Sequence, residues 1–384
     1  LDRIYQYKMT TTSGGNLSIK DNDGNIWITP ARVDKGQLSP KDIVCVRPDG
    51  TVEGIHRPSS EFPFHKAIYE ARADLRAVVH AHPMALVAFS CAHKVPETRL
   101  FPAAWMQNGR VGFAPYAIPG SAALGQSIAA KFREGYDSVV LENHGVCCGG
   151  ATLQQAFQRF EILELCAKAT IKAHAVGTPN VLTEEQLQLA QKQPARLESF
   201  EYDVERMSIR EKQLRCELAE FIRRGYRQRL LTSTTGSFSA RIDEHSFLIT
   251  PYPLDRYTIE PEDFVMIRKG KQQVGRNPSR AVTAHQAVYA ASPAVMAIVN
   301  AHPVNALAFS VCRQRVDTRT IPESYVFVGE VSLLPFASVY TDFAKLAQAL
   351  TVTTPSAIVE NNGVMLVGRD ILSVFDKLEV LECS

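Results

Sequence analysis

The chain has 384 residues, of which 45% are hydrophobic and 21% are charged, and its formal net charge is +2. This length predicts two domains of roughly 100–200 residues each, and the composition is that of a folded globular protein rather than a disordered one. No apolar run reaches the ~20 residues of a membrane span, and a nearly neutral chain without a basic block argues against nucleic acid or a membrane as the partner. A small-molecule partner is therefore expected.

Eight cysteines are scattered along the chain without a CxxC spacing. The adjacent Cys147 and Cys148 do not fit a disulfide framework, so reduced cysteines in the core are expected. No signal peptide is expected, and together with reduced cysteines this favours a cytoplasmic location as the expectation.

The first predicted elements are strands at 17–20 and 26–29, joined by an Asn-Asp-Gly turn at 22–24. A short strand at 44–46 follows. The next helix is predicted to start after Ser60, which is a suitable N-cap residue.

Two histidines end the next predicted strand, 77–82. Side chains alternate along a strand, so His80 and His82 lie on the same face of it. A third imidazole, His144, comes soon after the strand-like run 138–141. Three histidines around one zinc ion leave its fourth position open, as catalytic zinc sites require.

Helices are also predicted at 121–132 and 152–173, and the second of them is amphipathic. The segment 179–205 is polar and rich in glutamine and contains two prolines. It is predicted to be a linker with a short helix at 183–191.

The two halves of the chain share a series of short motifs in the same order. The matched segments are 13–18 with 234–239, 28–30 with 249–251, 38–44 with 259–265, 80–83 with 300–303 and 142–145 with 360–363. An offset of about 220 residues at every landmark predicts two copies of one unit. The predicted domains are copy one at 1–178 and copy two at 206–384, with the linker at 179–205 between them.

Each residue of interest in copy one also has an ordinary structural explanation. A His-x-His pair in a strand is often a surface pair, and an acid such as Glu61 in a first helical turn is stabilised by the helix dipole alone. Ser59 and Ser60 could simply cap the helix, and His144 could form a tight turn before a glycine. The combination of Asn16, the Ser-Ser-Glu helix start and the three histidines in one unit favours a functional site.

In this order, Gly-Gly-Asn-x-Ser, Ile-Thr-Pro, Pro-Ser-Ser-Glu, His-x-His-Pro and Asn-His-Gly resemble the motifs of the class II aldolase/adducin family. The type members of this family are fuculose-phosphate aldolase and ribulose-phosphate 4-epimerase. The resemblance covers nearly the whole chain, twice over. It implies an α/β fold of two tandem α/β/α domains, each with a central, mainly antiparallel sheet flanked by helices.

The resemblance also implies a divalent metal, usually zinc but otherwise Mn²⁺, Co²⁺ or Fe²⁺, held by His80, His82 and His144. Glu61 would then be the catalytic acid/base. The residues implied for the substrate's phosphate or an equivalent anion are Asn16, Thr29, Ser59 and Ser60. A metal that chelates the carbonyl and hydroxyl oxygens of a substrate acts as a Lewis acid on the enediolate of an aldol cleavage.

Copy one departs from the family pattern after Thr29-Pro30, where Ala31-Arg32 replaces a small hydroxylic residue and a glycine. The Arg32 guanidinium can hold a carboxylate or phosphate in a fork, or it can be an exposed loop arginine. Both interpretations stay open, and the identity of the substrate stays open with them.

Copy two has lost the residues that carry this chemistry. The positions of Glu61, His80 and His144 are taken, in that order, by Ala281, Asn300 and Asn362. Alanine cannot carry a proton and carboxamides are poor zinc ligands, so copy two is expected to be a metal-free pseudo-domain. The matched His65 and His285, on the helix after the Glu61 position, are expected to be structural in both copies.

The expected function is a metal-dependent aldolase that cleaves or forms a carbon–carbon bond of a small sugar phosphate or hydroxy-keto acid, with one active site per chain. A sugar-phosphate 4-epimerase, a decarboxylase or a dehydratase would use the same residues, and an adducin-like binding or scaffold protein is the non-catalytic alternative. The simple members of the family form fourfold assemblies, so two tandem chains are expected to pair as a homodimer that resembles a tetramer.

Overall fold

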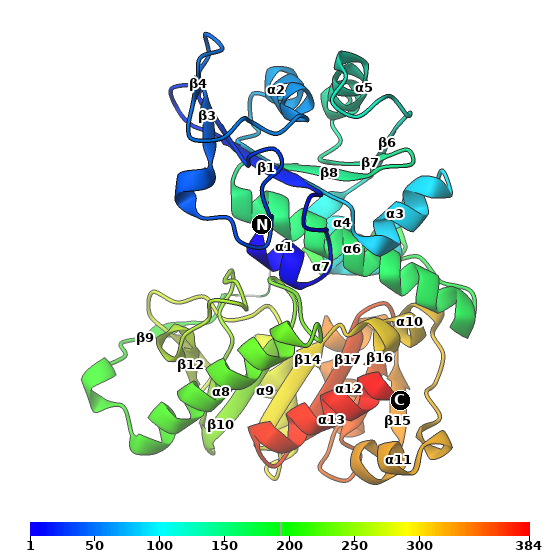
Figure 1. Cartoon of the computed structure of the whole chain (residues 1–384). Helices are drawn as coiled ribbons and strands as arrows, with labels where there is room; N and C mark the ends of the chain where they lie inside the picture. Colours follow the sequence, from blue (N-terminus) through cyan, green and yellow to red (C-terminus); the bar gives the residue numbers. More distant parts are fainter. Residues whose placement is uncertain (193, 195) are drawn as a thin grey trace. The chain divides into compact units, whose positions relative to one another are not determined.

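The computed structural model describes residues 1–192, 194 and 196–384, and it divides into two compact units (Figure 1). Unit 1 comprises 1–98 and 103–171, and unit 2 comprises 99–102 and 172–384. Two residues of the predicted linker, Gln193 and Ala195, lie outside the described residues. The limits of the predicted domains stay a prediction.

The first part of the chain forms one sheet, most of whose strands are antiparallel. Its strands are β1 (Asn16–Lys20), β2 (Ile26–Ile28), β3 (Val44–Val46), β4 (Val52–Glu53), β5 (Ala77–Ala81), β6 (Gly112–Ala114), β7 (Ser138–Leu141) and β8 (Gly145–Gly150). Their order is β4-β3-β2-β1-β5-β8-β7-β6. Within the described residues, β6 and β7 are the one parallel pair of this sheet, which confirms the predicted mainly antiparallel arrangement.

Helices cover both faces of this sheet (Figure 1). They are α1 (Asp2–Gln6), α2 (Phe62–Ala71), α3 (Met84–Cys91), α4 (Pro102–Asn108), α5 (Ala122–Arg133) and α6 (Leu153–Val176). Phe64 of α2 and Ile128 of α5 share one buried core with Val78 of the sheet. Phe160 of α6 shares the other core with Val79. Adjacent residues of β5 therefore face opposite helix layers, because side chains alternate along a strand.

This alternation places the first histidine of the site. His80 follows Val79 and so faces the same side of the sheet as Val78, toward α2. Its ring meets the ring of Phe64 edge-on, with 5.3 Å between the centroids. The helix that carries Glu61 at its start therefore packs directly over the strand that carries the histidines.

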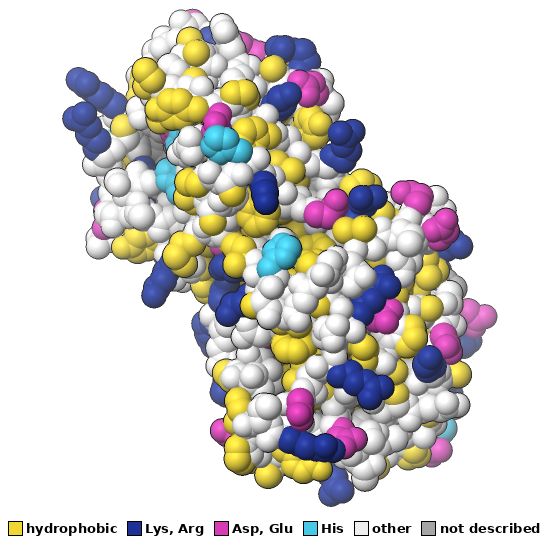
Figure 2. Space-filling view, turned by 90° about the vertical axis from the view of Figure 1, so that its right-hand side faces the viewer, with side chains coloured by type: hydrophobic (Ala, Val, Ile, Leu, Met, Phe, Trp, Pro, Cys, Tyr) yellow, Lys and Arg dark blue, Asp and Glu magenta, His cyan; other side chains and the backbone are white. Residues whose placement is uncertain are grey.

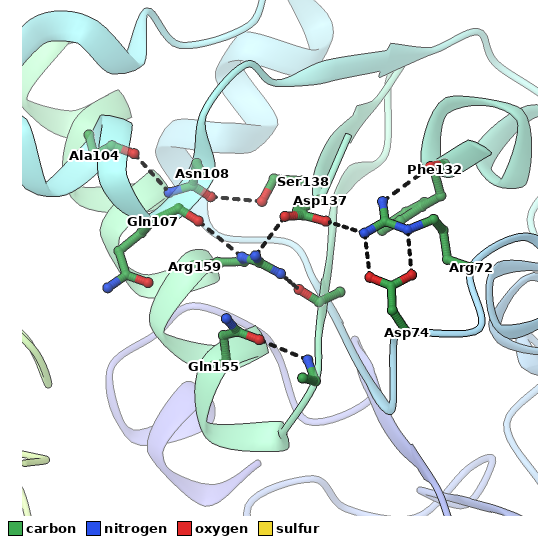
Figure 3. A network of polar contacts seen from close by, with 12 residues as sticks. Arg72, Asp74, Ala104, Gln107, Asn108, Phe132, Asp137, Ser138, Gln155 and Arg159 are labelled. Atoms are coloured by element: carbon green, nitrogen blue, oxygen red, sulfur yellow. Dashed lines mark hydrogen bonds and ion pairs between the residues drawn. The ribbon is translucent and has the colours of Figure 1, made fainter. Parts of the chain in front are cut away.

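A network of charged side chains joins helices from the two layers (Figure 3). Arg72, which ends α2, pairs with Asp74 at 2.7 Å and with Asp137 at 3.0 Å. Arg159 of α6 pairs with Asp137 at 2.6 Å. Asp137, just before β7, thus links one helix from each face to the sheet.

The second part of the chain repeats the architecture. Its strands are β9 (Ser199–Phe200), β10 (Ser237–Asp243), β11 (Ser246–Ile249), β12 (Val265–Arg268), β13 (Lys271–Gln273), β14 (Ala297–Ala301), β15 (Val331–Leu334), β16 (Ser356–Val359) and β17 (Gly363–Gly368). Their order is β15-β16-β17-β14-β10-β11-β12-β13-β9. Within the described residues, the parallel pairs are β15 with β16 and β13 with β9.

The helices of this part are α7 (Glu184–Gln191), α8 (Ile209–Arg227), α9 (Val282–Ala291), α10 (Val304–Cys312), α11 (Pro322–Val328), α12 (Phe343–Ala349) and α13 (Ile371–Cys383). Those after α7 again form two layers. Leu218 of α8 and Phe375 of α13 share a core with Val299. Tyr289 of α9 and Ile298 belong to the other core. The predicted α/β/α layering is therefore confirmed in both units.

The strand register aligns the two copies at the candidate site. In unit 1, β1 pairs with β5 so that Asn16 lies opposite His80. In unit 2, β10 pairs with β14 so that Ser237 lies opposite Asn300. The correspondence inferred from the sequence motifs is thus also a correspondence in space within each unit.

Two local predictions have different outcomes. The helix predicted at 183–191 is α7, and the Thr183 hydroxyl accepts a hydrogen bond from Gln186 N–H at 3.3 Å. The prediction of Ser60 as the N-cap of α2 was wrong, because α2 begins at Phe62 with Glu61 as its N-cap. The hydroxyl that supports this turn is that of Ser59, which accepts from Glu61 N–H at 3.3 Å.

All eight cysteines are free, in agreement with the expected reduced state. The expectation that they lie in the core was wrong for Cys91, Cys216 and Cys383, which are exposed because they lie on helix surfaces. None of the helices within the described residues is long and apolar enough to cross a membrane. On the face drawn in Figure 2, basic and acidic side chains are interspersed among hydrophobic ones.

Candidate active site

The three histidines predicted as ligands lie together. His80 and His82 come from the end of β5, and His144 precedes β8, which is hydrogen-bonded to β5. The ring centroids lie 4.8 Å apart for His80 with each of the other two, and 4.9 Å apart for His82 with His144. The strand pairing therefore brings a residue more than sixty positions away beside the His-x-His pair.

The loop that carries His144 depends on two special backbone positions. Asn143 has a φ of 54°, in the left-handed region that asparagine tolerates better than most residues. A Cβ atom on Gly145 would lie 2.6 Å from the carbonyl oxygen of Ala81 and 2.8 Å from the ring of His82. Only glycine therefore allows this loop to approach the end of β5 so closely.

The geometry of the imidazole nitrogens fits a metal ion. One ligand atom from each histidine lies within 4.8 Å of the others. His80 Nδ1 lies 2.9 Å from the carbonyl oxygen of Val146, so Nδ1 carries the proton and the lone pair of Nε2 faces the other rings. His80 Nε2 and His82 Nε2 are 3.0 Å apart, a separation that needs a shared proton or a shared cation. His144 Nδ1 is buried without a hydrogen-bond partner.

The surroundings keep two of these rings neutral, as metal ligation requires. Burial is the largest cause that lowers the pKa of His82, to about 3, with further lowering by His80 and His144. Burial likewise lowers the pKa of His144 to about 4. At neutral pH both imidazoles have a free lone pair to offer a cation.

Glu61 lies against the histidines. Its Oε2 is 3.3 Å from His80 Nε2, and its Oε1 is 3.4 Å from His144 Nε2. Burial raises the pKa of this carboxyl, but the neighbouring His80 ring and the Asn16 amide lower it more, so the pKa of Glu61 is shifted well below its ordinary value. Oε1 is buried and accepts no hydrogen bond among the described residues.

Four of the five residues predicted to bind an anion divide into two groups. Thr29 and Ser59 are buried and adjacent, because Ser59 N–H donates to the Thr29 carbonyl at 3.2 Å. The Thr29 hydroxyl accepts from Leu17 N–H at 3.2 Å, as the Ser59 hydroxyl accepts from Glu61, so each hydroxyl proton can be donated elsewhere. Ser60 and Arg32 are exposed, and no hydrogen bond or ion pair joins their side chains to the other candidates in the described part of the chain.

Arg32 occupies a position suited to glycine. Its φ is 57°, in the left-handed region where glycine adds no steric cost. The resemblance described above implies a glycine at this position. The Arg32 residue is exposed.

Asn16, the fifth residue predicted to bind an anion, contacts Glu61 and His65. Its Nδ2 donates to Glu61 Oε2 at 2.7 Å, and its Oδ1 lies 2.5 Å from His65 Nε2. His65 Nδ1 lies 2.6 Å from the hydroxyl of Ser18, which is 2.7 Å from the hydroxyl of Tyr69. No sequence pattern predicts this chain of contacts, although His65 lies one helical turn after Glu61.

The equivalent position in unit 2 keeps part of this arrangement and lacks the ligands. Asn300 Nδ2 donates to the Val364 carbonyl at 3.3 Å, in the way that His80 uses Val146. His302 Nε2 lies 3.4 Å from the Asn362 amide oxygen. Ala281 replaces the glutamate. Unit 2 therefore has one imidazole and no carboxylate at this position, whereas unit 1 has three imidazoles and one carboxylate.

Unit 1 is thus an α/β/α domain with three histidines that are placed to hold a metal ion. The chain belongs to the family of the class II aldolase and adducin N-terminal domain, whose pattern matches residues 1–171 and again 216–384. This match confirms both the resemblance and the tandem duplication. The chain is a class II aldolase-like lyase.

Individual relatives each match about half of the chain. An L-fuculose phosphate aldolase of Methanocaldococcus jannaschii is 34% identical over 175 residues, which cover 44% of this chain and 90% of the relative. A 5-deoxy-D-ribulose 1-phosphate aldolase of Bacillus thuringiensis serovar kurstaki is 33% identical over 47% of this chain and 84% of the relative. A 3-oxo-tetronate 4-phosphate decarboxylase of Escherichia coli is 33% identical over 43% of this chain and 79% of the relative.

Proposed function

We propose that the chain is a divalent-metal-dependent aldolase that acts on a small sugar phosphate, with one active site per chain, in copy one. The observation that carries the proposal is the convergence of His80, His82 and His144 on the carboxylate of Glu61. These histidines would hold a divalent ion, Zn²⁺ or one of Mn²⁺, Co²⁺ and Fe²⁺. As a Lewis acid, the ion would stabilise negative charge on the substrate's oxygens.

Glu61 is the proposed proton carrier. When an aldol breaks, its carbon–carbon bond leaves a carbanionic carbon that must gain a proton, while the hydroxyl of the other fragment loses one. Oε2 is held by Asn16, and Oε1 is the oxygen without a hydrogen bond, so Oε1 is the atom that accepts and returns the proton. Glu61 is ionised at neutral pH, because the net shift of its pKa is downward.

The substrate's anionic group is proposed to lie at the start of α2. The hydroxyls of Thr29 and Ser59 have protons to donate there, and Ser60 and Arg32 are exposed beside them along the chain. Backbone N–H groups at a helix start also attract an anion. The three relatives described above are each named for a phosphorylated substrate. This supports the proposal that the anionic group is a phosphate.

A decarboxylase for a phosphorylated 3-oxo acid is the second candidate, because one of the similar proteins carries that name. Loss of CO₂ from a 3-oxo acid also leaves a carbanionic carbon that needs a proton, so the same carboxylate would serve. We further propose that two chains pair as a homodimer, so that four family domains assemble as in a tetramer.

The proposal is tested on metal-loaded protein by assaying C–C cleavage or CO₂ release from L-fuculose phosphate, 5-deoxy-D-ribulose 1-phosphate and 3-oxo-tetronate 4-phosphate. Glu61→Gln should lower kcat by about 10²–10⁴-fold, the usual contribution of a general acid–base group. His82→Ala should abolish activity. The matched control is His302→Ala, at the equivalent position of copy two, which should retain the activity of the wild type.

Two results would contradict the proposal. One is the absence of bond cleavage with every substrate and every metal. The other is equal activity loss in His82→Ala and His302→Ala, since the site would then not be confined to copy one.

A further inference from the structure

A chain of buried hydrogen bonds runs from Glu61 back through the core of unit 1. Its members, in order from the carboxylate, are Glu61, Asn16, His65, Ser18 and Tyr69, and consecutive heteroatoms are 2.5–2.7 Å apart. His65 is fully buried, and Asn16 and Ser18 are almost fully buried. Because α2 supplies His65 and Tyr69 and begins directly after Glu61, while β1 supplies Asn16 and Ser18, the chain also joins these two elements.

The direction of every bond in this chain follows from its end. An ionised carboxylate can only accept, so the Asn16 NH₂ group faces Glu61 and the amide oxygen faces His65. His65 Nε2 must then carry a proton, and burial lowers the pKa of this imidazole to about 3, so His65 is neutral and its Nδ1 accepts. Ser18 therefore donates to His65, and Tyr69 donates to Ser18. All the donors point toward Glu61.

Copy two holds a natural comparison. Ser239 Oγ lies 2.7 Å from His285 Nδ1 and 2.8 Å from the hydroxyl of Tyr289, as in copy one. Ser237 stands where Asn16 does, and Ala281 stands where Glu61 does. His285 Nε2 and the Ser237 hydroxyl are consequently buried without hydrogen-bond partners in the described structure. The fold thus keeps the Ser–His–Tyr part without a site, and only copy one continues it to a carboxylate.

We propose that His65 is a positioning residue for the reaction, which acts through Asn16 to hold Oε2 of Glu61 and so keeps Oε1 beside His144, where it can exchange a proton with a substrate. The proposal rests on the proposed role of Glu61. It goes beyond a structural role, because the structural part of the arrangement is already complete in copy two. His65 itself touches neither the histidine ligands by a hydrogen bond nor the proposed anion site.

The experiment compares His65→Leu with His65→Gln, whose amide can still donate to Asn16, and with Asn16→Ser, which leaves His65 in place. His285→Leu is the matched control, because it removes the same imidazole from the same Ser–His–Tyr setting. Each variant is measured for kcat, KM, bound metal and resistance to urea. His65→Leu and Asn16→Ser should lower kcat by about 10- to 100-fold through a misplaced carboxylate, with KM changed less than about twofold and the metal retained.

The remaining variants separate positioning from folding. His65→Gln should recover most of the lost kcat. His285→Leu should leave kcat unchanged and lower urea resistance no more than His65→Leu does, because it removes one hydrogen bond rather than two. The proposal is overturned if His65→Leu and Asn16→Ser both keep kcat within twofold of the wild type, or if His285→Leu lowers kcat as much as His65→Leu. If Asn16→Ser is the one variant of the two that folds well, its kcat alone decides whether the proposal stands, and a value within twofold of the wild type overturns it.

An independent readout separates this inference from the proposed function. The ¹⁵N resonances of His65 should report a neutral ring with its proton on Nε2, and a proton on Nδ1 would overturn the chain of donors from Tyr69 to Glu61. If the wild type cleaves no substrate but shows the Nε2–H tautomer, the proposed function fails and the hydrogen-bond chain stands as a device that holds the carboxylate. If the tautomer is wrong, the inference fails whatever the activity.

Discussion

His65 and His285 occupy matching positions in the two copies. Comparing them separates the contacts that the fold requires from those that the site requires. Each imidazole is fully buried and each is bonded to a serine hydroxyl on the neighbouring strand. The difference lies at Nε2, which meets an amide in copy one and no partner among the described residues in copy two. A buried polar atom without a partner costs roughly 1–3 kcal/mol, so copy two carries this cost without the benefit of a placed carboxylate.

The free energy of unfolding in acid should depend on His285. Burial lowers its pKa to about 3 from 6.5, so below pH 6.5 the unfolded chain binds a proton that the folded chain does not. Stability is therefore complete above the unfolded pKa and falls as the pH drops through 6.5 toward 3, by up to ~1.4 kcal/mol per pH unit for this group. In His285→Gln, the slope of unfolding free energy against pH between about pH 6 and pH 4 should be smaller by that amount. Urea titrations at several pH values measure it, and identical slopes for variant and wild type would contradict the burial of a neutral His285 as the cause.

At the scale of elements, the site depends on how closely the loop before β8 approaches the end of β5. The loop is held by Gly145, where any side chain would meet the Ala81 carbonyl and the His82 ring. The Ala81 carbonyl belongs to the backbone, so it cannot rotate away from an added side chain as the His82 ring could. The separation of His144 from His82 therefore depends on this glycine more than on the histidines themselves.

Gly145→Ala should cost about 1–3 kcal/mol of unfolding free energy, as other overpacking substitutions do, and should weaken metal binding at least about tenfold. Competition with a chromogenic chelator measures the affinity. Gly177→Ala is the control, because the nearest atom to its added Cβ is 3.8 Å away. Metal affinity in Gly145→Ala equal to that of the control would show that the loop can move without disturbing His144.

The sequence predicts the elements of the site better than the contacts between them. Strand periodicity and turn residues locate β5, β7 and the His-x-His pair, because these signals are local. The bond from Asn16 to Glu61 spans 45 positions and depends on the packing of α2 over β1, which no local pattern reports. The predicted N-cap was misplaced by one residue in the same segment, which is joined to a residue distant in sequence by the Pro30–Pro58 bridge.

At the scale of the whole chain, duplication has left two α/β/α units of similar topology with unequal chemistry. Copy two keeps the strand register, the Ser–His–Tyr arrangement and the backbone carbonyl that orients the first histidine of copy one. These are the features that fold the unit. It lacks the glutamate and two of the three histidines, which are the features that the fold does not require.

Native mass spectrometry of protein purified without added metal distinguishes one metal site per chain from two. A single working site, in copy one, gives particles of two chains and two zinc-like ions, with the ions lost in His80→Ala and kept in His302→Ala. Two ions per chain, or retention of the metal in His80→Ala, would contradict the assignment to copy one. Metal-free protein that also refuses added zinc would contradict the metal site itself.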